Sequence, residues 1–127
     1  TRSTPSDGKR LIDDFEDRGE RTWSTAEISR LLRLYTSGLD VEDIAEAMYL
    51  DRKDIAARLS RDLLGATGET LVDPTARRFQ QGYEQWEYAV MARWGADLPF
   101  SAIVRELERD QLGVGWRMLN RGIPRRG

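Results

Sequence analysis

The chain of 127 residues contains no cysteine and no histidine. It therefore offers neither a disulfide nor a thiol nucleophile, and it lacks the commonest metal ligand and general base. No apolar run approaches the roughly 18 residues that a transmembrane helix needs, and no Gly-rich phosphate loop or nucleophile motif is present. We therefore expect a cytoplasmic protein that is not an enzyme, does not cross a membrane, and has no catalytic residues, metal site or cofactor.

An excess of positive charge, which nucleic-acid-binding domains usually carry, is also absent. The chain has 20 basic and 22 acidic residues, and its net charge is −2. Residues 23–65 hold six basic and eight acidic groups, whereas residues 83–127 hold seven and six and end in Arg121, Arg125 and Arg126. The overall charge weighs against nucleic-acid binding, although the C-terminal third is slightly basic.

Apolar material is sufficient for a packed interior. Hydrophobic residues make up 39% of the chain and include four tryptophans, which argues against wholesale disorder. At this length the chain can form one ordinary domain or two small domains, each with a marginal core. Because it begins at Thr1 and not at methionine, we interpret it as a piece or a processed product of a longer protein.

Apolar residues recur at helical spacing through residues 23–64 and predict three helices. Ser24 is placed to cap the first helix, with a glutamate three residues later as in a capping box. Two shorter helices follow over residues 41–49 and 52–64, joined by a tight turn in which Asp51 can cap the second. Such a closely joined pair is typical of a helix-turn-helix unit.

The second half is predicted to be helical as well. We interpret residues 65–73 as a linker, after which Pro74 occupies the first position of a helix. Aromatic and apolar residues then follow at helical spacing and predict one continuous helix of about twenty residues whose stripe lies in the core. The members of this stripe are Phe79, Tyr83, Trp86, Val90 and Trp94. Two shorter helices are expected over residues 100–108 and 111–119.

The second half repeats the pattern of the first at a distance of 59 residues. Asp51 coincides with Asp110 and Arg58 with Arg117 at this shift, together with most apolar positions. We therefore predict an all-α protein of two tandem three-helix helix-turn-helix units. Its parts are a lead-in with a short brace helix over 10–18 (residues 1–22), a first unit (23–64), a linker (65–73), a second, divergent unit (74–121) and a basic tail (122–127).

Several features of the first unit resemble Myb/SANT-like, or homeodomain-like, helix-turn-helix domains. They are Trp23-Ser24, Glu27, the apolar run 31–35, Gly38, Ile44-Ala45 and the stretch 55–59. The spacing of the last two is also similar to that in LuxR-type regulators and in region 4 of sigma factors. The likeness extends more weakly to residues 83–119. Tyr49 departs from the family pattern, because many such turns have glycine there, and Gly113 and Gly115 weaken the last helix.

The resemblance implies that the third helix of each unit enters the major groove of double-stranded DNA, as part of a larger transcriptional regulator or DNA-processing protein. Arginine and lysine there can contact guanine edges or phosphates. Ala57 is expected on the same exposed face. The residues expected to bind DNA are Arg52, Lys53, Arg58 and Arg61 in the first unit, and Gln111, Arg117, Arg121 and Arg125 in the second unit and tail.

Three further features each have two interpretations. The arginines of the third helices can instead form a solvated face with local ion pairs, such as Asp54 with Arg58. Trp116 can pack against Trp94 in the core, which we favour, or lie flat on a partner. The tail, residues 122–127, is either an arm that follows a nucleic-acid backbone or a frayed end.

A rival function follows from the acidic residues of the second predicted helix. Four carboxylates there would repel phosphate, so the unit either turns them away from DNA or binds a basic protein surface. They belong to Asp40, Glu42, Asp43 and Glu46. The alternative to DNA binding is therefore a protein–protein interaction module that keeps the helix-turn-helix fold without binding nucleic acid.

Overall fold

The computed structural model describes residues 20–126, so the brace helix expected over residues 10–18 lies outside the described residues. Within the described range every regular element is helical, which confirms the all-α prediction. The elements are α2 (Thr25–Thr36), α3 (Val41–Met48), α4 (Arg52–Leu59), the π-helical turn η1 (Ser60–Leu64), α5 (Gln85–Met91), α6 (Phe100–Leu107), α7 (Gln111–Asn120) and α8 (Ile123–Arg126). None of these helices is long and apolar enough to cross a bilayer.

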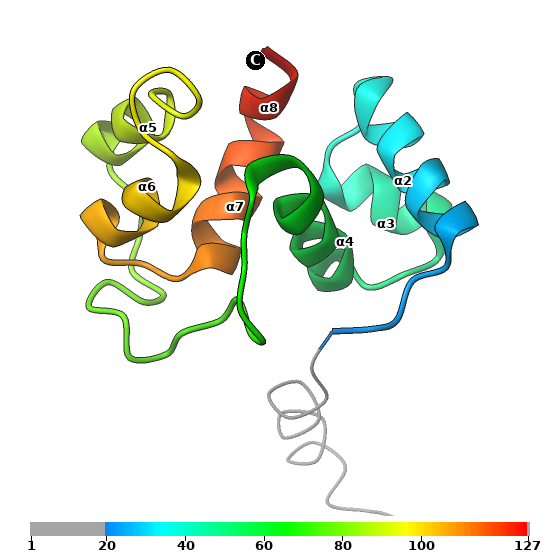
Figure 1. Cartoon of the computed structure of the whole chain (residues 1–127), viewed down its shortest axis with the longest axis horizontal. Helices are drawn as coiled ribbons and strands as arrows, with labels where there is room; N and C mark the ends of the chain where they lie inside the picture. The colour runs from blue at the N-terminus through cyan, green and yellow to red at the C-terminus, as the bar shows by residue number, and fades with distance from the viewer. Residues whose placement is uncertain (1–19, 127) are drawn as a thin grey trace, which may run out of the picture.

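The helices lie in three groups around one core (Figure 1). The pair α2 and α3 lies on one side and the pair α5 and α6 on the other, while α4, η1 and α7 pack together in the centre. Residues buried in the shared core come from both halves of the chain, for example Leu31 and Ile55 in the first and Ile103 and Met118 in the second. The two halves therefore share one interior.

The helix starts follow from the capping residues of the sequence. Ser24 Oγ accepts from the amide of Glu27 at 3.1 Å, and the Glu27 carboxylate accepts from the Ser24 amide at 3.0 Å, which completes the expected capping box. Asp51 caps α4 through the amide of Lys53 at 2.8 Å, and Asp110 caps α7 through the amide of Gly113 at 3.3 Å. The two caps lie 59 positions apart.

The turns before these caps also match at this distance. The helix before each turn spans eight residues, 41–48 in α3 and 100–107 in α6. Each ends in a left-handed residue that is not glycine, Tyr49 at φ 58° and Glu108 at φ 56°. A side chain in this region costs free energy, so Tyr49 tolerates a conformation that glycine would adopt more readily.

The long helix predicted from Pro74 is wrong. Residues 74–84 form a chain of turns, in which Gln80 has φ 63°, and α5 begins only at Gln85. The carbonyls of residues 78, 81 and 82 accept hydrogen bonds from the guanidinium of Arg109, at 2.8, 2.7 and 2.9 Å. A tertiary contact therefore takes the acceptors that helix formation would use, and it outweighs the helical spacing of the aromatic residues.

Candidate nucleic-acid interface

Helix α4 has little free surface, although it is the predicted DNA-reading helix of the first unit. Five of its eight residues are buried, namely Asp54, Ile55, Ala56, Ala57 and Leu59. It packs against α3 on one side and α7 on the other. The expectation that Ala57 is exposed is wrong, since its relative exposure is only 5%; it did not allow for α7.

Arg58 and Arg61, which were predicted to bind DNA, are engaged by carboxylates within the protein. Arg58 forms a two-pronged ion pair with Asp62, with Nε–Oδ2 at 3.0 Å and Nη2–Oδ1 at 2.7 Å. Arg61 binds both carboxylate oxygens of Glu20 and also donates to the carbonyl of Gly68 at 2.6 Å. These contacts hold the guanidinium groups toward the chain's own carboxylates, and binding DNA through them would require breaking the pairs.

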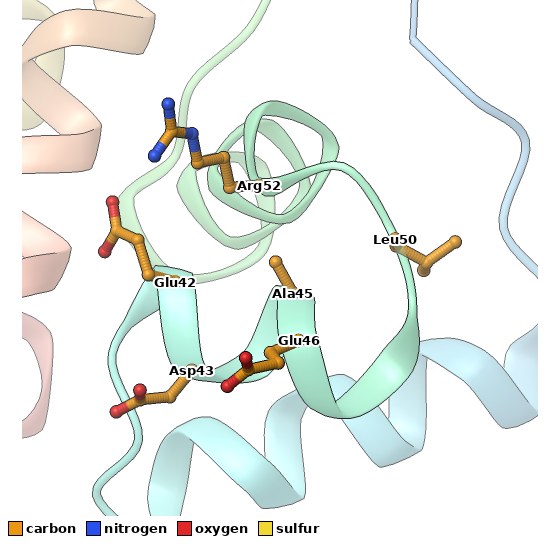
Figure 2. Close-up of a pocket in the computed structure, with 6 residues that line it drawn as sticks. All are labelled: Glu42, Asp43, Ala45, Glu46, Leu50 and Arg52. Carbon is orange, nitrogen blue, oxygen red and sulfur yellow. The ribbon is translucent and has the colours of Figure 1, made fainter.

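Arg52 and Lys53 lie in the first turn of α4, where Arg52 is exposed and Lys53 is half-buried. Arg52 borders a hollow of about 340 Å³ that is otherwise lined by α3 and the turn, through Glu42, Asp43, Ala45, Glu46 and Leu50. Figure 2 shows the three carboxylate side chains pointing toward the same side as Arg52, while Leu50 points away. Three carboxylates beside one guanidinium make this region repulsive to phosphate.

The predicted residues of α7 and the tail have different environments. The Gln111 amide group holds the linker, accepting from the Thr67 amide at 3.1 Å and donating to the Thr67 carbonyl at 2.8 Å. Arg125 donates to the carbonyls of Tyr35 and Leu39 at 3.2 and 3.4 Å. Residues 123–126 form α8, and Arg125 thereby fastens α8 to the end of α2.

Arg117 and Arg121 remain exposed at one edge of α7, one helical turn apart. Their guanidinium groups stack over tyrosine rings from the α5 side, Arg117 at 4.8 Å from the centroid of Tyr83 and Arg121 at 3.7 Å from that of Tyr88. Burial raises the pKa of Tyr83 to about 12. Their N–H groups stay available to a partner, because stacking uses the plane of a guanidinium and not its N–H edge.

The neighbouring edge of α7 contacts α3. The indole N–H of Trp116 donates to Glu42 Oε2 at 3.2 Å, and Asn120 Nδ2 donates to Glu42 Oε1 at 3.4 Å. Asn120 Oδ1 in turn accepts from the amide of Val41 at 3.3 Å. One of the four acidic side chains singled out in the sequence is therefore a structural link between the two halves.

The two glycines of α7 make room for close packing. A Cβ on Gly115 would overlap Ser60 Oγ at the junction of α4 and η1, and one on Gly113 would lie 2.7 Å from Asp110 Oδ1 and 2.9 Å from the Tyr83 hydroxyl. Ser60 Oγ is buried and has no hydrogen-bond partner. The group that approaches Gly115 therefore belongs to the first half of the same chain.

A buried ion pair that was not predicted from the sequence organises the second half. Arg109 binds Glu87 through Nε–Oε2 at 2.6 Å and Nη2–Oε1 at 3.0 Å, and the two side chains are 2% and 1% exposed. Although burial opposes ionisation of Glu87, hydrogen bonds from Arg109 and from the Glu84 amide hold its pKa below the ordinary value. One signal was available: the 59-residue shift places Arg109 on Leu50, an apolar position.

Charge is separated along the chain on the scale of single helices. Residues 39–51 carry five acidic groups and no basic one, whereas residues 111–127 carry four arginines and no acidic group. The first stretch contains α3 and the second contains α7.

Comparison of the chain with protein-family models, with curated proteins and with solved structures found no match.

Proposed function

We propose that this chain is a protein-interaction module made of two helix-turn-helix copies that have turned their third helices toward each other. The observation that carries the proposal is the packing of α4 against α7. A helix that reads DNA needs one full face free to enter the major groove. In α4 five of the eight residues are buried, and α7 from the other half packs against the helix.

Electrostatics supports the same conclusion. Several arginines of the described range are paired with carboxylates, including Arg58, Arg61 and Arg109. The start of α4, which lies nearest to base edges in helix-turn-helix complexes, is flanked by Glu42, Asp43 and Glu46. A protein surface of mixed charge suits such a face better than a polyanion does.

The test measures binding of the full chain to random-sequence duplex DNA at a series of salt concentrations, with fluorescence anisotropy as the readout. We expect no complex tighter than about 10⁻⁴ M at about 0.15 M salt, the weak end of non-specific binding. The variant Arg52→Ala with Lys53→Ala should behave like the wild type. The proposal would be overturned by a micromolar dissociation constant for duplex DNA that is lost in this variant. In that case the logarithm of the binding constant should fall linearly with the logarithm of the salt concentration.

A second candidate function is duplex binding by the outer edge of α7. It is favoured by Arg117 and Arg121, which are exposed on a stretch without acidic residues. In the same titration, Arg117→Ala with Arg121→Ala would then abolish binding, while the Arg52 and Lys53 variant would keep it. The salt slope would fall by about one for each phosphate contact removed.

A further inference from the structure

The face of α7 that is open to solvent lies between the acidic residues of α3 and the arginines on the opposite edge of α7 itself. We call it the bipolar face. It comprises the acidic edge Asp43 and Glu46 on α3, the central strip Trp116 and Asn120 on α7, and the basic edge Arg117 and Arg121 on α7. The central strip joins the two edges, because Trp116 and Asn120 are hydrogen-bonded to Glu42 of α3.

We propose that a second copy of this chain docks on the bipolar face, forming a symmetric dimer. This inference rests on the proposed function and names the partner. Under a two-fold axis the same patch of each chain meets itself, so residues on one side of the axis contact those on the other. With the axis through the central strip, the acidic edge of one chain lies against the basic edge of its partner, and the reverse.

The spacing of the charges fits this pairing. Asp43 and Glu46 are three residues apart on α3, and Arg117 and Arg121 are four apart at the C-terminal end of α7, so the Cβ atoms within each edge lie about 5–6 Å apart. No ion pair within the described residues engages Asp43, Glu46, Arg117 or Arg121. These edges therefore carry charge that the fold leaves unpaired.

The composition of the face is also that of an interface. Trp116 of the central strip and Tyr88, which lies beneath Arg121 at the border of the face, are both partly buried against the core. Tryptophan, tyrosine and arginine are the residues that most often dominate binding energy at protein interfaces. Tyr88 holds Arg121 flat at 3.7 Å, which reduces the entropy that this arginine would lose on binding.

The experiment is a charge exchange followed by sedimentation equilibrium of the full chain. The wild type should dimerise at about 0.05 M salt and dissociate as salt is raised, since the ion pairs lie at the edges of the interface. Reversing either edge, by Arg117→Glu with Arg121→Glu or by Asp43→Lys with Glu46→Lys, should weaken self-association on the order of a hundredfold. An equimolar mixture of the two variants should dimerise again, because each supplies the charge that the other lacks.

A matched control separates these contacts from net charge. The variant Arg33→Glu with Arg105→Glu changes the net charge by as much as the variant Arg117→Glu with Arg121→Glu, but at exposed positions of α2 and α6. It should dimerise nearly as well as the wild type. Circular dichroism is used to check that each variant is folded. Restoration in the mixture supports the inference even where a single variant loses some stability.

Three outcomes would overturn the inference: a wild type that stays monomeric up to about 1 mM at low salt, a mixture of folded variants that remains monomeric, or a control that loses as much affinity as the edge variants. None of these depends on the duplex titration. If the chain is monomeric and has no affinity for DNA, only the proposed dimer is refuted. If it binds duplex DNA through Arg52 and Lys53, the proposed function is refuted. Duplex binding lost on reversing Arg117 and Arg121, and not restored by mixing, would assign the face to nucleic acid.

Discussion

Replacing Glu87 by glutamine should destabilise the protein strongly, because it leaves the Arg109 guanidinium buried without a counter-charge. All five N–H groups of Arg109 are engaged, two by Glu87 and three by the carbonyls of residues 78, 81 and 82. Breaking a buried pair by removing one partner costs about 3–5 kcal/mol. This is a large part of the roughly 5–15 kcal/mol by which a domain of this size is stable.

Urea unfolding followed by circular dichroism and tryptophan fluorescence measures the effect. With a loss of about 4 kcal/mol and a slope of about 2 kcal/mol per molar urea, the midpoint should fall by about 2 M. The control is Glu106→Gln, an exposed carboxylate of α6, which should change stability by less than about 0.5 kcal/mol. Hydrogen exchange should show the loss of protection centred on residues 76–84, where Arg109 holds the turns.

The double variant Glu87→Leu with Arg109→Met tests whether the pair acts as a unit. It removes both charges and fills similar volume, so its cost should be smaller than the sum of Glu87→Leu and Arg109→Met alone. Gln81 and Gly82 are exposed, so water can replace the donors that their carbonyls lose. A Glu87→Gln variant that costs less than about 1 kcal/mol, or a double variant whose cost is simply additive, would refute this reasoning.

The same pair predicts a pH dependence. The pKa of Glu87 is lowered in the folded protein from its ordinary value of 4.5. The carboxylate therefore contributes stability that is fully present above pH 4.5 and is lost as the pH falls through the lowered value. The difference in unfolding free energy between the wild type and Glu87→Gln should accordingly narrow in this acidic range. A difference that stays constant down to pH 2 would contradict the assigned sign.

Three further substitutions test other features. Burial raises the pKa of Asp110, so its charged form is disfavoured in the folded protein. Asp110→Asn keeps an N-cap acceptor and should stabilise the protein at neutral pH. Urea titrations should show that this gain vanishes as the pH falls through the raised pKa. Gly115→Ala should lower stability by about 1–3 kcal/mol through overlap with Ser60 and lower the melting temperature, and adding Ser60→Gly should recover most of the loss. Tyr49→Gly should raise the melting temperature, since Tyr49 is 94% exposed and left-handed; an unchanged or lower value would count against strain at this turn.

Local signals in the sequence predicted most of the first half. Ser24 and Asp51 are capping residues with mechanisms confined to their own helices, and the hydrogen bonds they predict are present. The 59-residue shift also aligned Asp110 with Asp51, and both are N-caps. Features that depend on a few neighbouring residues can be read from the chain, because no distant contact has to be known.

Features decided by distant residues could not be predicted in this way. The helical stripe that begins at Phe79 failed because Arg109, about thirty positions later, takes the backbone carbonyls. The prediction that Ala57 is exposed was wrong because α4 is packed between other helices, including α7. Nothing within α4 itself indicates that α7 is a neighbour. The residues expected to bind DNA follow the same division. The helical positions of Arg52, Lys53 and Arg58 were predicted, but the ion pair of Arg61 with Glu20 joins residues 41 positions apart. DNA binding by these residues stays a prediction.

The crossing of α4 and α7 has a consequence for how the chain must fold. Each half alone would leave exposed the helix face that the other covers, and neither holds a complete interior. Because residues 65–84 join the two halves, their meeting is intramolecular, with an effective concentration in the millimolar range for a short linker. Assembly of the interior is therefore indifferent to how dilute the protein is. In a chain cut within residues 65–73 the two fragments would become obligate partners, folded together above a threshold concentration and unfolded apart below it.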